Sequence, residues 1–178
     1  MTNVVWRPSQ SYVQGSNLKR LMDRHGIESF DDVLKRSIDD IEWYWKAVDE
    51  DLEFEWDRPY DLVMDQSRGI EWTTWFTGGA INITANCVDR HAKGARASKT
   101  ALIWEGEDAA SRSVTYSELA IEVNRLANAL RSIGVGKGDA VGVYMPMSIE
   151  AVAAMFAVAK IGAIYLPIFS GFAPEAVA

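Results

Sequence analysis

Cysteine and histidine are scarce in this chain, and their scarcity limits the chemistry that it can support. Its 178 residues contain one cysteine, Cys87, and two histidines, His25 and His91. A single cysteine excludes an internal disulfide bond. Cys87 and His91 would share a helix face, but two ligands make a poor metal site and an activated cysteine needs further positioned groups. The sequence therefore predicts neither a metal centre nor a cysteine nucleophile.

Positive charge and long hydrophobic runs are also missing. The chain has 18 Lys and Arg against 25 Asp and Glu, so it lacks the excess of basic residues that nucleic-acid binding requires. Residues 1–8 carry no basic region ahead of an apolar core, as a secretory signal would. The most apolar stretch, 151–169, is interrupted by Lys160 and Pro167, whereas a membrane span needs about 20 apolar residues. We expect a cytoplasmic protein with no nucleic-acid or membrane partner.

Short capped helices are predicted in the first third of the chain. Ser16 can cap a helix that ends at the following His-Gly pair, and Ser29 can cap the next helix. Ser37 and Asp40 repeat the capping pattern. Apolar residues then follow at helical spacing over residues 41–48.

Acidic and aromatic residues are concentrated in these predicted helices and just after them. We interpret the acidic residues as a solvated face. They are Asp31, Asp32, Asp39, Asp40, Asp49, Glu50, Asp51, Glu53, Glu55 and Asp57. The aromatic cluster is interpreted as packing against a neighbouring domain, with a ligand platform as the alternative. Its members are Trp43, Tyr44, Trp45, Phe54 and Trp56.

The middle of the chain shows little periodicity. Residues 72–79 form a turn-rich aromatic segment, and residues 81–91 are predicted to run into a helix. Residues 92–99 are small and basic, as expected of a loop at a domain boundary. We therefore expect a helical, aromatic-rich part over 1–98 and a second part over 99–178.

Strands and helices alternate in the second part. Strands are predicted over 101–105 and 112–115, and a capping box at Thr115 and Glu118 opens a helix that Gly134 ends. The apolar face of this helix is predicted to consist of Leu119, Val123, Leu126, Leu130 and Ile133.

A second helix lies between two further predicted strands. The strands cover 140–144 and 163–167, and the helix over 149–161 is apolar on nearly all sides, so we expect it to be buried. A strand-helix-strand order of this kind favours right-handed crossovers and parallel pairing. The fold class is therefore α/β, with a helical extension ahead of the first strand-helix-strand units.

Two glycine-rich stretches are weak phosphate-binding candidates. Residues 134–138, GVGKG, follow a helix and precede a strand, whereas a phosphate loop follows a strand and opens a helix. Residues 77–79, TGG, have no lysine nearby. Residues 168–175 follow the carboxyl end of a predicted parallel strand, where α/β sheets bind ligands. The alternative for this last segment is a strand-to-helix turn, with Pro174 in the first helical turn.

Several motifs occur in one order along the chain and together resemble a known enzyme family. They are WFTGGAIN (75–82), NCVDRH (86–91), ALIWEGE (101–107), TYSEL (115–119), GVGKGD (134–139), YMPM (144–147), KIGA (160–163) and FSGF (169–172). From about residue 29 onward, the chain resembles the N-terminal part of acetyl-CoA and propionyl-CoA synthetases. These enzymes are AMP-forming acyl-CoA ligases of the adenylate-forming superfamily.

The resemblance implies both a fold and a reaction. Residues 1–98 would be the N-terminal cap, and 99–178 the truncated start of the large AMP-binding domain. The family uses ATP and Mg²⁺ to convert a carboxylic acid into an acyl-adenylate, and then transfers the acyl group to CoA. Its phosphate loop and its C-terminal domain with a catalytic lysine have no counterpart in these residues, so the resemblance implies no catalytic residue here. The segment itself is expected to be inactive and to bind none of these cofactors tightly.

The resemblance also implies a candidate CoA-binding edge. The family's CoA nucleotide lies near a Phe-Gly-Gly-Phe turn, which is matched here by Phe169, Ser170, Gly171 and Phe172. Ser170 departs from the family glycine, which matters if the backbone must approach CoA closely. Residues 165–167 also replace a His-containing stretch that is typical of acetyl-CoA synthetases. Both departures point to a relative acting on another short or medium acyl group.

Two functions of different classes remain open. The first is the N-terminal segment of a ligase whose partners are a small carboxylic acid and CoA. The second is a free-standing module that binds CoA or a synthetase partner without chemistry. A reading frame that continues past Ala178 into a phosphate loop favours the first, and a natural stop codon favours the second. A dinucleotide-dependent oxidoreductase is weaker, because the glycines are misplaced.

The isolated chain is expected to self-associate. The helix over 149–161 needs cover on every side, and the strands at 140–144 and 163–167 need neighbours. Sedimentation equilibrium at micromolar concentration should therefore show a dimer or a domain-swapped species. A monomer near 19.8 kDa without dye-accessible apolar surface would show instead that the N-terminal helices cover the domain. That result would favour the free-standing module.

Overall fold

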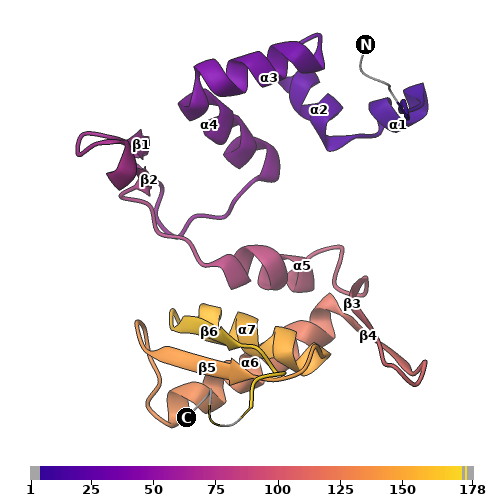
Figure 1. Cartoon of the computed structure of the whole chain (residues 1–178), viewed down its shortest axis with the longest axis vertical. Helices are drawn as coiled ribbons and strands as arrows, with labels where there is room; N and C mark the ends of the chain where they lie inside the picture. Colours follow the sequence, from indigo (N-terminus) through magenta and orange to yellow (C-terminus); the bar gives the residue numbers. More distant parts are fainter. Residues whose placement is uncertain (1–4, 174, 176–178) are drawn as a thin grey trace. The chain divides into compact units, whose positions relative to one another are not determined.

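Short helices open the part of the chain that the structure describes, residues 5–173 and 175 of a computed structural model (Figure 1). They are α1 (Gln10–Gln14), α2 (Asn17–Arg24), α3 (Phe30–Asp39) and α4 (Ile41–Leu52). Together with a hairpin within 58–80 they form the first of two compact units. The second unit consists of residues 55–57 and the chain from residue 81 onward.

The caps of these helices follow the sequence pattern, with one exception. Ser16 accepts a hydrogen bond from the amide of Lys19 at the start of α2, and Ser29 caps α3 in the same way. Both predictions are confirmed. The prediction for Ser37 is wrong, because Ser37 lies inside α3 and its hydroxyl donates to the carbonyl of Leu34. Asp40 is itself the N-cap of α4 and accepts from the amide of Trp43 at 3.0 Å.

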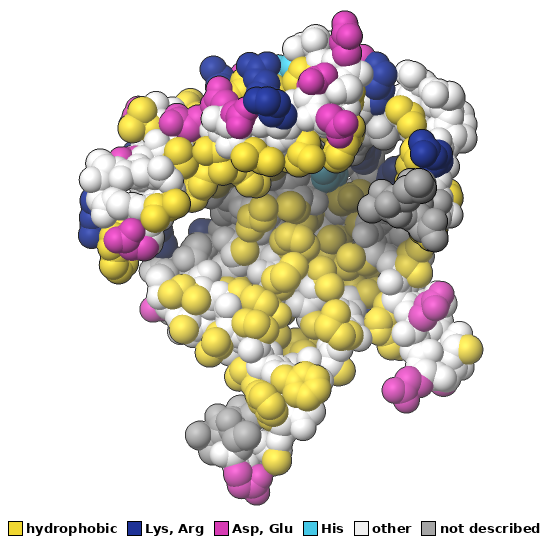
Figure 2. Space-filling view, turned by 45° about the horizontal axis from the view of Figure 1, so that its top comes forward, with side chains coloured by type: hydrophobic (Ala, Val, Ile, Leu, Met, Phe, Trp, Pro, Cys, Tyr) yellow, Lys and Arg dark blue, Asp and Glu magenta, His cyan; other side chains and the backbone are white. Residues whose placement is uncertain are grey.

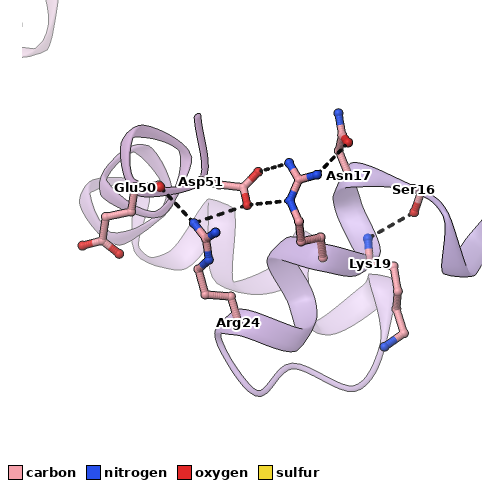
Figure 3. A network of polar contacts seen from close by, with 7 residues as sticks. Ser16, Asn17, Lys19, Arg24, Glu50 and Asp51 are labelled. Carbon is pink, nitrogen blue, oxygen red and sulfur yellow. Dashed lines mark hydrogen bonds and ion pairs between the residues drawn. The ribbon is translucent and has the colours of Figure 1, made fainter. Parts of the chain in front are cut away.

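An acidic side chain joins α2 to α4 (Figure 3). The carboxylate of Asp51 accepts hydrogen bonds from Arg20 at 3.1 and 3.3 Å, and Arg24 lies 3.4 Å from it. Arg24 also donates to the backbone carbonyl of Glu50 at 2.9 Å. The Asp51 side chain is only 6% exposed, so the interpretation of a solvated acidic face does not hold at this position.

The aromatic residues of α4 pack within the first unit. Trp43 contacts the ring of His25 edge-on at 5.4 Å between centroids, and the guanidinium of Arg36 lies 3.8 Å from the Trp43 ring centroid. Trp45 packs against Trp75 at 6.1 Å. These contacts join α4 to α2, α3 and β2 within the first unit, so Trp43 and Trp45 pack inside their own unit and not, as predicted, against a neighbouring domain.

An antiparallel hairpin completes the first unit and was not predicted. Strand β1 (Leu62–Asp65) pairs with β2 (Thr74–Thr77), and the 3-10 turn Ile70–Trp72 lies between them. Tyr60 supports the hairpin: its ring packs on Phe76 at 5.0 Å, and its hydroxyl donates to Asp49 at 3.0 Å. Burial, followed by the contact with Asp49, raises the pKa of Tyr60 to about 12.

The second unit contains the predicted alternation of strands and helices. A helical segment, comprising the π-helix Ala85–Asp89 and α5 (Arg90–Lys93), precedes the hairpin β3 (Thr100–Glu105) and β4 (Ser111–Thr115). Helix α6 (Tyr116–Ser132), strand β5 (Ala140–Tyr144), helix α7 (Ile149–Lys160) and strand β6 (Ile164–Ile168) follow. Strands β5 and β6 pair in parallel, with Ala140 opposite Ile164 and Tyr144 opposite Ile168. The α/β fold class is confirmed.

The core of the second unit lies between α6 and α7. Small residues on both helices allow close approach, and the π-helix contributes one side chain to the same core. The buried residues are Val88, Leu119, Ala120, Val123, Ala127, Ala153, Ala157 and Ile161. Helix α7 has no exposed residue except Glu150, as its all-round apolar pattern predicts. Ile133, predicted on the buried face of α6, is instead its C-cap and is 76% exposed.

Both helices end as the sequence predicts. The amide of Val135 donates to the carbonyl of Leu130, and Gly134 adopts a φ of +92°, which completes a Schellman motif after α6. The same pattern follows α7, where Gly162 has a φ of +76°. The predicted capping box of α6 is also confirmed, with hydrogen bonds in both directions between Thr115 and Glu118. Those bonds from Thr115 lower the pKa of Glu118.

One face of the β5–β6 pair is not covered within the second unit. Tyr144, Ile164 and Leu166 alternate on this face and are each about half exposed, while Val143 is buried on the opposite face. Hydrophobic side chains are spread widely over the surface of this unit, in the lower half of Figure 2. The expectation of self-association rests on such surface and stays a prediction.

No helix among residues 5–173 and 175 is long and apolar enough to cross a membrane. The two compact units divide near residue 80, whereas the sequence places the domain boundary at 98. Because compactness and domain origin are different criteria, the boundary at 98 stays a prediction.

The structure identifies Asp40 as the residue that caps the N-terminus of α4. Replacing Asp40→Ala removes the acceptor for the amide of Trp43 and should lower the free energy of unfolding by about 1 kcal/mol. Ser37→Ala is the matched control, and it should change stability by less than about 0.5 kcal/mol because the hydroxyl bonds only within its own helix. Urea denaturation followed by tryptophan fluorescence compares the two variants. A larger loss for Ser37→Ala than for Asp40→Ala would contradict the assignment.

Candidate functional site

A tight turn follows β6 at the carboxyl end of the parallel pair. The amide of Phe172 donates to the carbonyl of Phe169 at 3.0 Å and so closes the turn over Ser170 and Gly171. All of these residues are exposed. Residue 174 lies outside the described residues, and so does the predicted role of Pro174 in a following helix. The turn therefore presents two aromatic side chains and a short stretch of backbone at the sheet edge where α/β proteins bind ligands.

The third position of the turn lies against the ring of Phe169. The rings of Phe169 and Phe172 meet edge-to-face, with centroids 5.4 Å apart. A Cβ atom at Gly171 would lie only 2.6 Å from Cε1 of Phe169. Ser170 is exposed at the second position of the turn, which tolerates a side chain. The loss of the family glycine at Ser170 is therefore compatible with the observed backbone.

Tyr144 connects the end of β5 to this turn. Its hydroxyl donates to the backbone carbonyl of Phe172 at 2.7 Å, across 28 positions of sequence. The parallel register places Tyr144 opposite Ile168, the last residue of β6. The sequence places Tyr144 in a strand and in the YMPM motif but does not link it to the turn, because only the pairing of the strands brings its side chain there.

A second group of polar side chains lies at the other end of α7. Asn82 donates from Nδ2 to the carbonyl of Lys160 at 3.0 Å and accepts from the amide of Thr84 at 2.9 Å. Thr84 is fully buried, and its hydroxyl donates to the carbonyl of Phe156 at 2.8 Å. Such side chains satisfy buried backbone groups and fix α7 relative to the segment that precedes the π-helix.

The π-helix holds residues 55–57 in the second unit. Asn86 is buried, and its Oδ1 accepts from the amide of Glu55 at 2.8 Å while its Nδ2 donates to the carbonyl of Glu55 at 3.0 Å. This two-way pairing resembles a pair of strand hydrogen bonds made by a side chain. π-Helical turns are rare in proteins as a whole, but those that occur are often found at functional sites. In this chain the turn carries Asn86 inward and leaves Cys87 exposed.

An ion pair completes the attachment of α7. The ammonium of Lys160 contacts both carboxylate oxygens of Asp89, at 2.6 and 2.8 Å. The two side chains are only 25% and 20% exposed, so water screens their attraction less than at an open surface. A cleft of about 290 Å³ beside the pair is lined by Asp57 and Arg131 as well. Because both signs of charge line it, the cleft selects neither an anion nor a cation.

The remaining candidates from sequence do not form sites among the described residues. His91 is half-buried and packs on Tyr116 with ring centroids 5.0 Å apart, whereas Cys87 faces outward. Burial first, and then the charges of Arg90 and Arg96, lower the pKa of His91. Within 5–173 and 175, no three or more His, Cys, Asp or Glu side chains gather closely enough to hold a metal ion.

Neither glycine-rich stretch is arranged as a phosphate cradle. In the turn between α6 and β5, the amide of Gly136 donates to Asp139 at 2.8 Å and that of Gly138 to the carbonyl of Gly162 at 3.0 Å. These amides are therefore already used within the fold. At residues 77–79, the amide of Gly79 donates to the carbonyl of Phe76 at 3.0 Å, and both the carboxylate of Asp61 and the guanidinium of Arg58 lie at Gly78.

Two protein families match consecutive parts of the chain. "Acetyl-coenzyme A synthetase N-terminus" matches residues 30–87, and "AMP-binding enzyme" matches residues 88–178. The second match alone covers more than half of the chain.

Individual proteins give the same result. The chain is 41% identical over 171 residues to the acetyl-coenzyme A synthetase of Thiobacillus denitrificans, covering 96% of this chain and 25% of the relative. It is 49% identical over 135 residues to the 3-hydroxypropionyl-coenzyme A synthetase of Metallosphaera sedula, covering 76% of this chain and 20% of the relative. The chain thus spans a quarter or less of the length of these relatives.

A solved structure is also similar. The acetoacetyl-CoA synthetase from Streptomyces lividans matches with a TM-score of 0.87 and 29% sequence identity. The match covers 97% of this chain and 27% of that protein. Sequence and structure therefore lead to the same group of proteins.

The ion pair at the end of α7 allows a quantitative test. Asp89→Asn or Lys160→Met alone leaves a partly buried partner charge, and each should lower the free energy of unfolding by about 1 to 3 kcal/mol. The double variant should lose less than the sum of the two single losses, since the removal of both charges leaves none unpaired. Chemical denaturation of the four proteins measures the coupling.

The matched control is the exposed pair Glu122 and Arg125, which are 2.9 Å apart on the surface of α6. Its neutralisation should change stability by less than about 0.5 kcal/mol. Equal coupling energies for the two pairs would show that partial burial does not strengthen the pair at α7.

Proposed function

The chain belongs to the AMP-binding enzyme family, as an acetyl-CoA-synthetase-like member, and on this premise we propose that it is the N-terminal segment of an acyl-CoA ligase. The complete ligase would activate a short or medium carboxylic acid with ATP and transfer the acyl group to CoA. The segment supplies scaffold and one edge of the CoA site, and not the reacting groups.

The observation that carries this proposal is the order of the two family matches. The synthetase-specific N-terminal match ends at residue 87, and the AMP-binding match begins at residue 88. The two meet inside the π-helix, where Asn86 and Val88 are both buried on either side of the exposed Cys87. The two matches therefore meet in a packed element and not in a linker. This supports the proposal that both parts fold together as one segment of a single enzyme.

The turn after β6 is the proposed CoA edge. Phe169 and Phe172 offer aromatic surface on which a nucleotide base can stack, and the exposed backbone at Ser170 and Gly171 allows close approach. No step of the chemistry is assigned to these residues. They bind and orient CoA, so that its thiol reaches an acyl-adenylate formed elsewhere in the enzyme.

ATP and Mg²⁺ belong to the whole ligase and not to the residues described. Binding of the Mg²⁺–ATP complex requires carboxylate ligands and a loop of amides around the phosphates. The described residues bring no three such ligands together, and the glycine-rich turns use their amides within the fold or lie beside Asp61. The fit is therefore poor, and this segment has no proposed role in forming the adenylate.

The acyl substrate is proposed at the level of a class. The similar proteins are named for acetyl, 3-hydroxypropionyl and acetoacetyl groups, which are all short acyl groups. The alternative function is a free-standing module that binds CoA without chemistry. The same exposed turn would serve that function, so the two proposals differ in what the complete gene product does.

Activity assays separate these two functions. The complete gene product should catalyse ATP–pyrophosphate exchange that depends on a short carboxylic acid, whereas residues 1–178 alone should show none with any acid. The reason is that transition-state charge in adenylyl transfer needs stabilising groups that this segment lacks.

The control is the complete protein without acid, which sets the background rate. Robust acid-dependent exchange from purified residues 1–178 would overturn the non-catalytic assignment. A complete gene product that binds CoA but catalyses no exchange would support the binding module instead.

A further inference from the structure

Within itself, the turn after β6 is closed by a single backbone hydrogen bond. The turn is closed by the bond from Phe172 to Phe169, and all of its residues are exposed. An exposed four-residue turn of this kind is mobile unless something outside it holds one end. Strand β6 holds the Phe169 end, because it pairs with β5 as far as Ile168.

Tyr144 holds the other end. Its hydroxyl donates to the carbonyl of Phe172 at 2.7 Å, so the last residue of β5 restrains the last residue of the turn. Both anchors of the turn therefore originate in β5: Tyr144 pairs with Ile168 through the backbone and with Phe172 through its side chain. A tyrosine does this at low entropic cost, because its ring has only two rotatable side-chain bonds.

We propose that Tyr144 is a positioning residue for the CoA half-reaction, which fixes the turn in its binding geometry before CoA arrives. This inference rests on the proposed function, in which the turn is the CoA edge. A preorganised turn loses less conformational freedom when the nucleotide binds, so affinity rises without a new contact. Tyr144 itself stays clear of the reacting atoms and acts through the backbone of Phe172.

If Tyr144 positions the turn for CoA, its substitution should change the KM for CoA and leave the adenylation step unchanged. Tyr144→Phe keeps the ring and removes only the hydroxyl, so the KM for CoA should rise about two- to tenfold, the range that one hydrogen bond supports. Acid-dependent ATP–pyrophosphate exchange needs no CoA and should be unchanged, as should the KM for ATP. A merely structural role would instead lower the exchange rate and the melting temperature together.

The chain offers a matched control in Tyr60. Its hydroxyl also donates a hydrogen bond, to Asp49 at 3.0 Å, but it lies in the first unit. Tyr60→Phe should lower the melting temperature and leave the KM for CoA unchanged. A second disruption of the turn comes from Gly171→Ala, whose Cβ would displace the ring of Phe169.

The double variant Tyr144→Phe with Gly171→Ala connects the two effects. Because both changes loosen the same turn, its KM for CoA should rise by less than the product of the two single effects. All assays use the complete gene product, with CoA varied at saturating ATP and acid. Support for the proposal is a rise in the KM for CoA alone together with this shortfall from the product.

Three results would overturn the inference. The first is an unchanged KM for CoA in Tyr144→Phe, and the second is a parallel loss of exchange and ligation. The third is a KM for CoA in the double variant that equals the product of the two single effects, which would show that Tyr144 and Gly171 act independently. Absence of acid-dependent exchange in the unmodified protein would be a different failure, because it would remove the proposed function and this inference with it.

Discussion

The attachment of residues 82–89 to α7 is the constraint on which the second unit depends. Asn82 and Thr84 bond to backbone carbonyls of α7, and Asp89 pairs with Lys160 at its end. Buried polar groups are costly when unsatisfied, so this set of partners strongly favours one placement of the helix. Val88 extends from the same segment into the core between α6 and α7. Polar and apolar contacts thus select the same arrangement.

That arrangement determines where the candidate site lies. Helix α7 contacts both parallel strands and leads through Gly162 directly into β6. A fixed helix therefore fixes the start of β6, and the pairing with β5 carries the register to its end. This series of contacts begins at the polar side chains of residues 82–89 and ends at the turn after β6, where the hydroxyl of Tyr144 bonds to Phe172.

The first unit is held together by different means. Its helices are short and bury few residues, and they are joined by the nearly buried carboxylate of Asp51 between two arginines and by edge-on aromatic contacts. A nearly buried charge needs an oppositely charged partner, because the loss of its hydration is otherwise not offset by any attraction. The acidic character of this part of the sequence is therefore only partly a property of its surface.

Local signals in the sequence determined the elements of the second unit, whereas tertiary structure decided its sites. The caps, the Schellman glycines and the apolar periods of α6 and α7 act within a few residues, so they could be read directly. The sequence does not predict the β1–β2 hairpin, because strands of four residues are too short to show a clear alternation of apolar and polar side chains. Their stability comes from contacts such as that of Tyr60 with Phe76. The family motifs include the turn at 169–172 and also Tyr144, Asp89 and Lys160, but they do not show that Tyr144 bonds to this turn or that Lys160 pairs with Asp89. Those contacts join residues 28 and 71 positions apart, and only the parallel register and the packing of α7 bring them together.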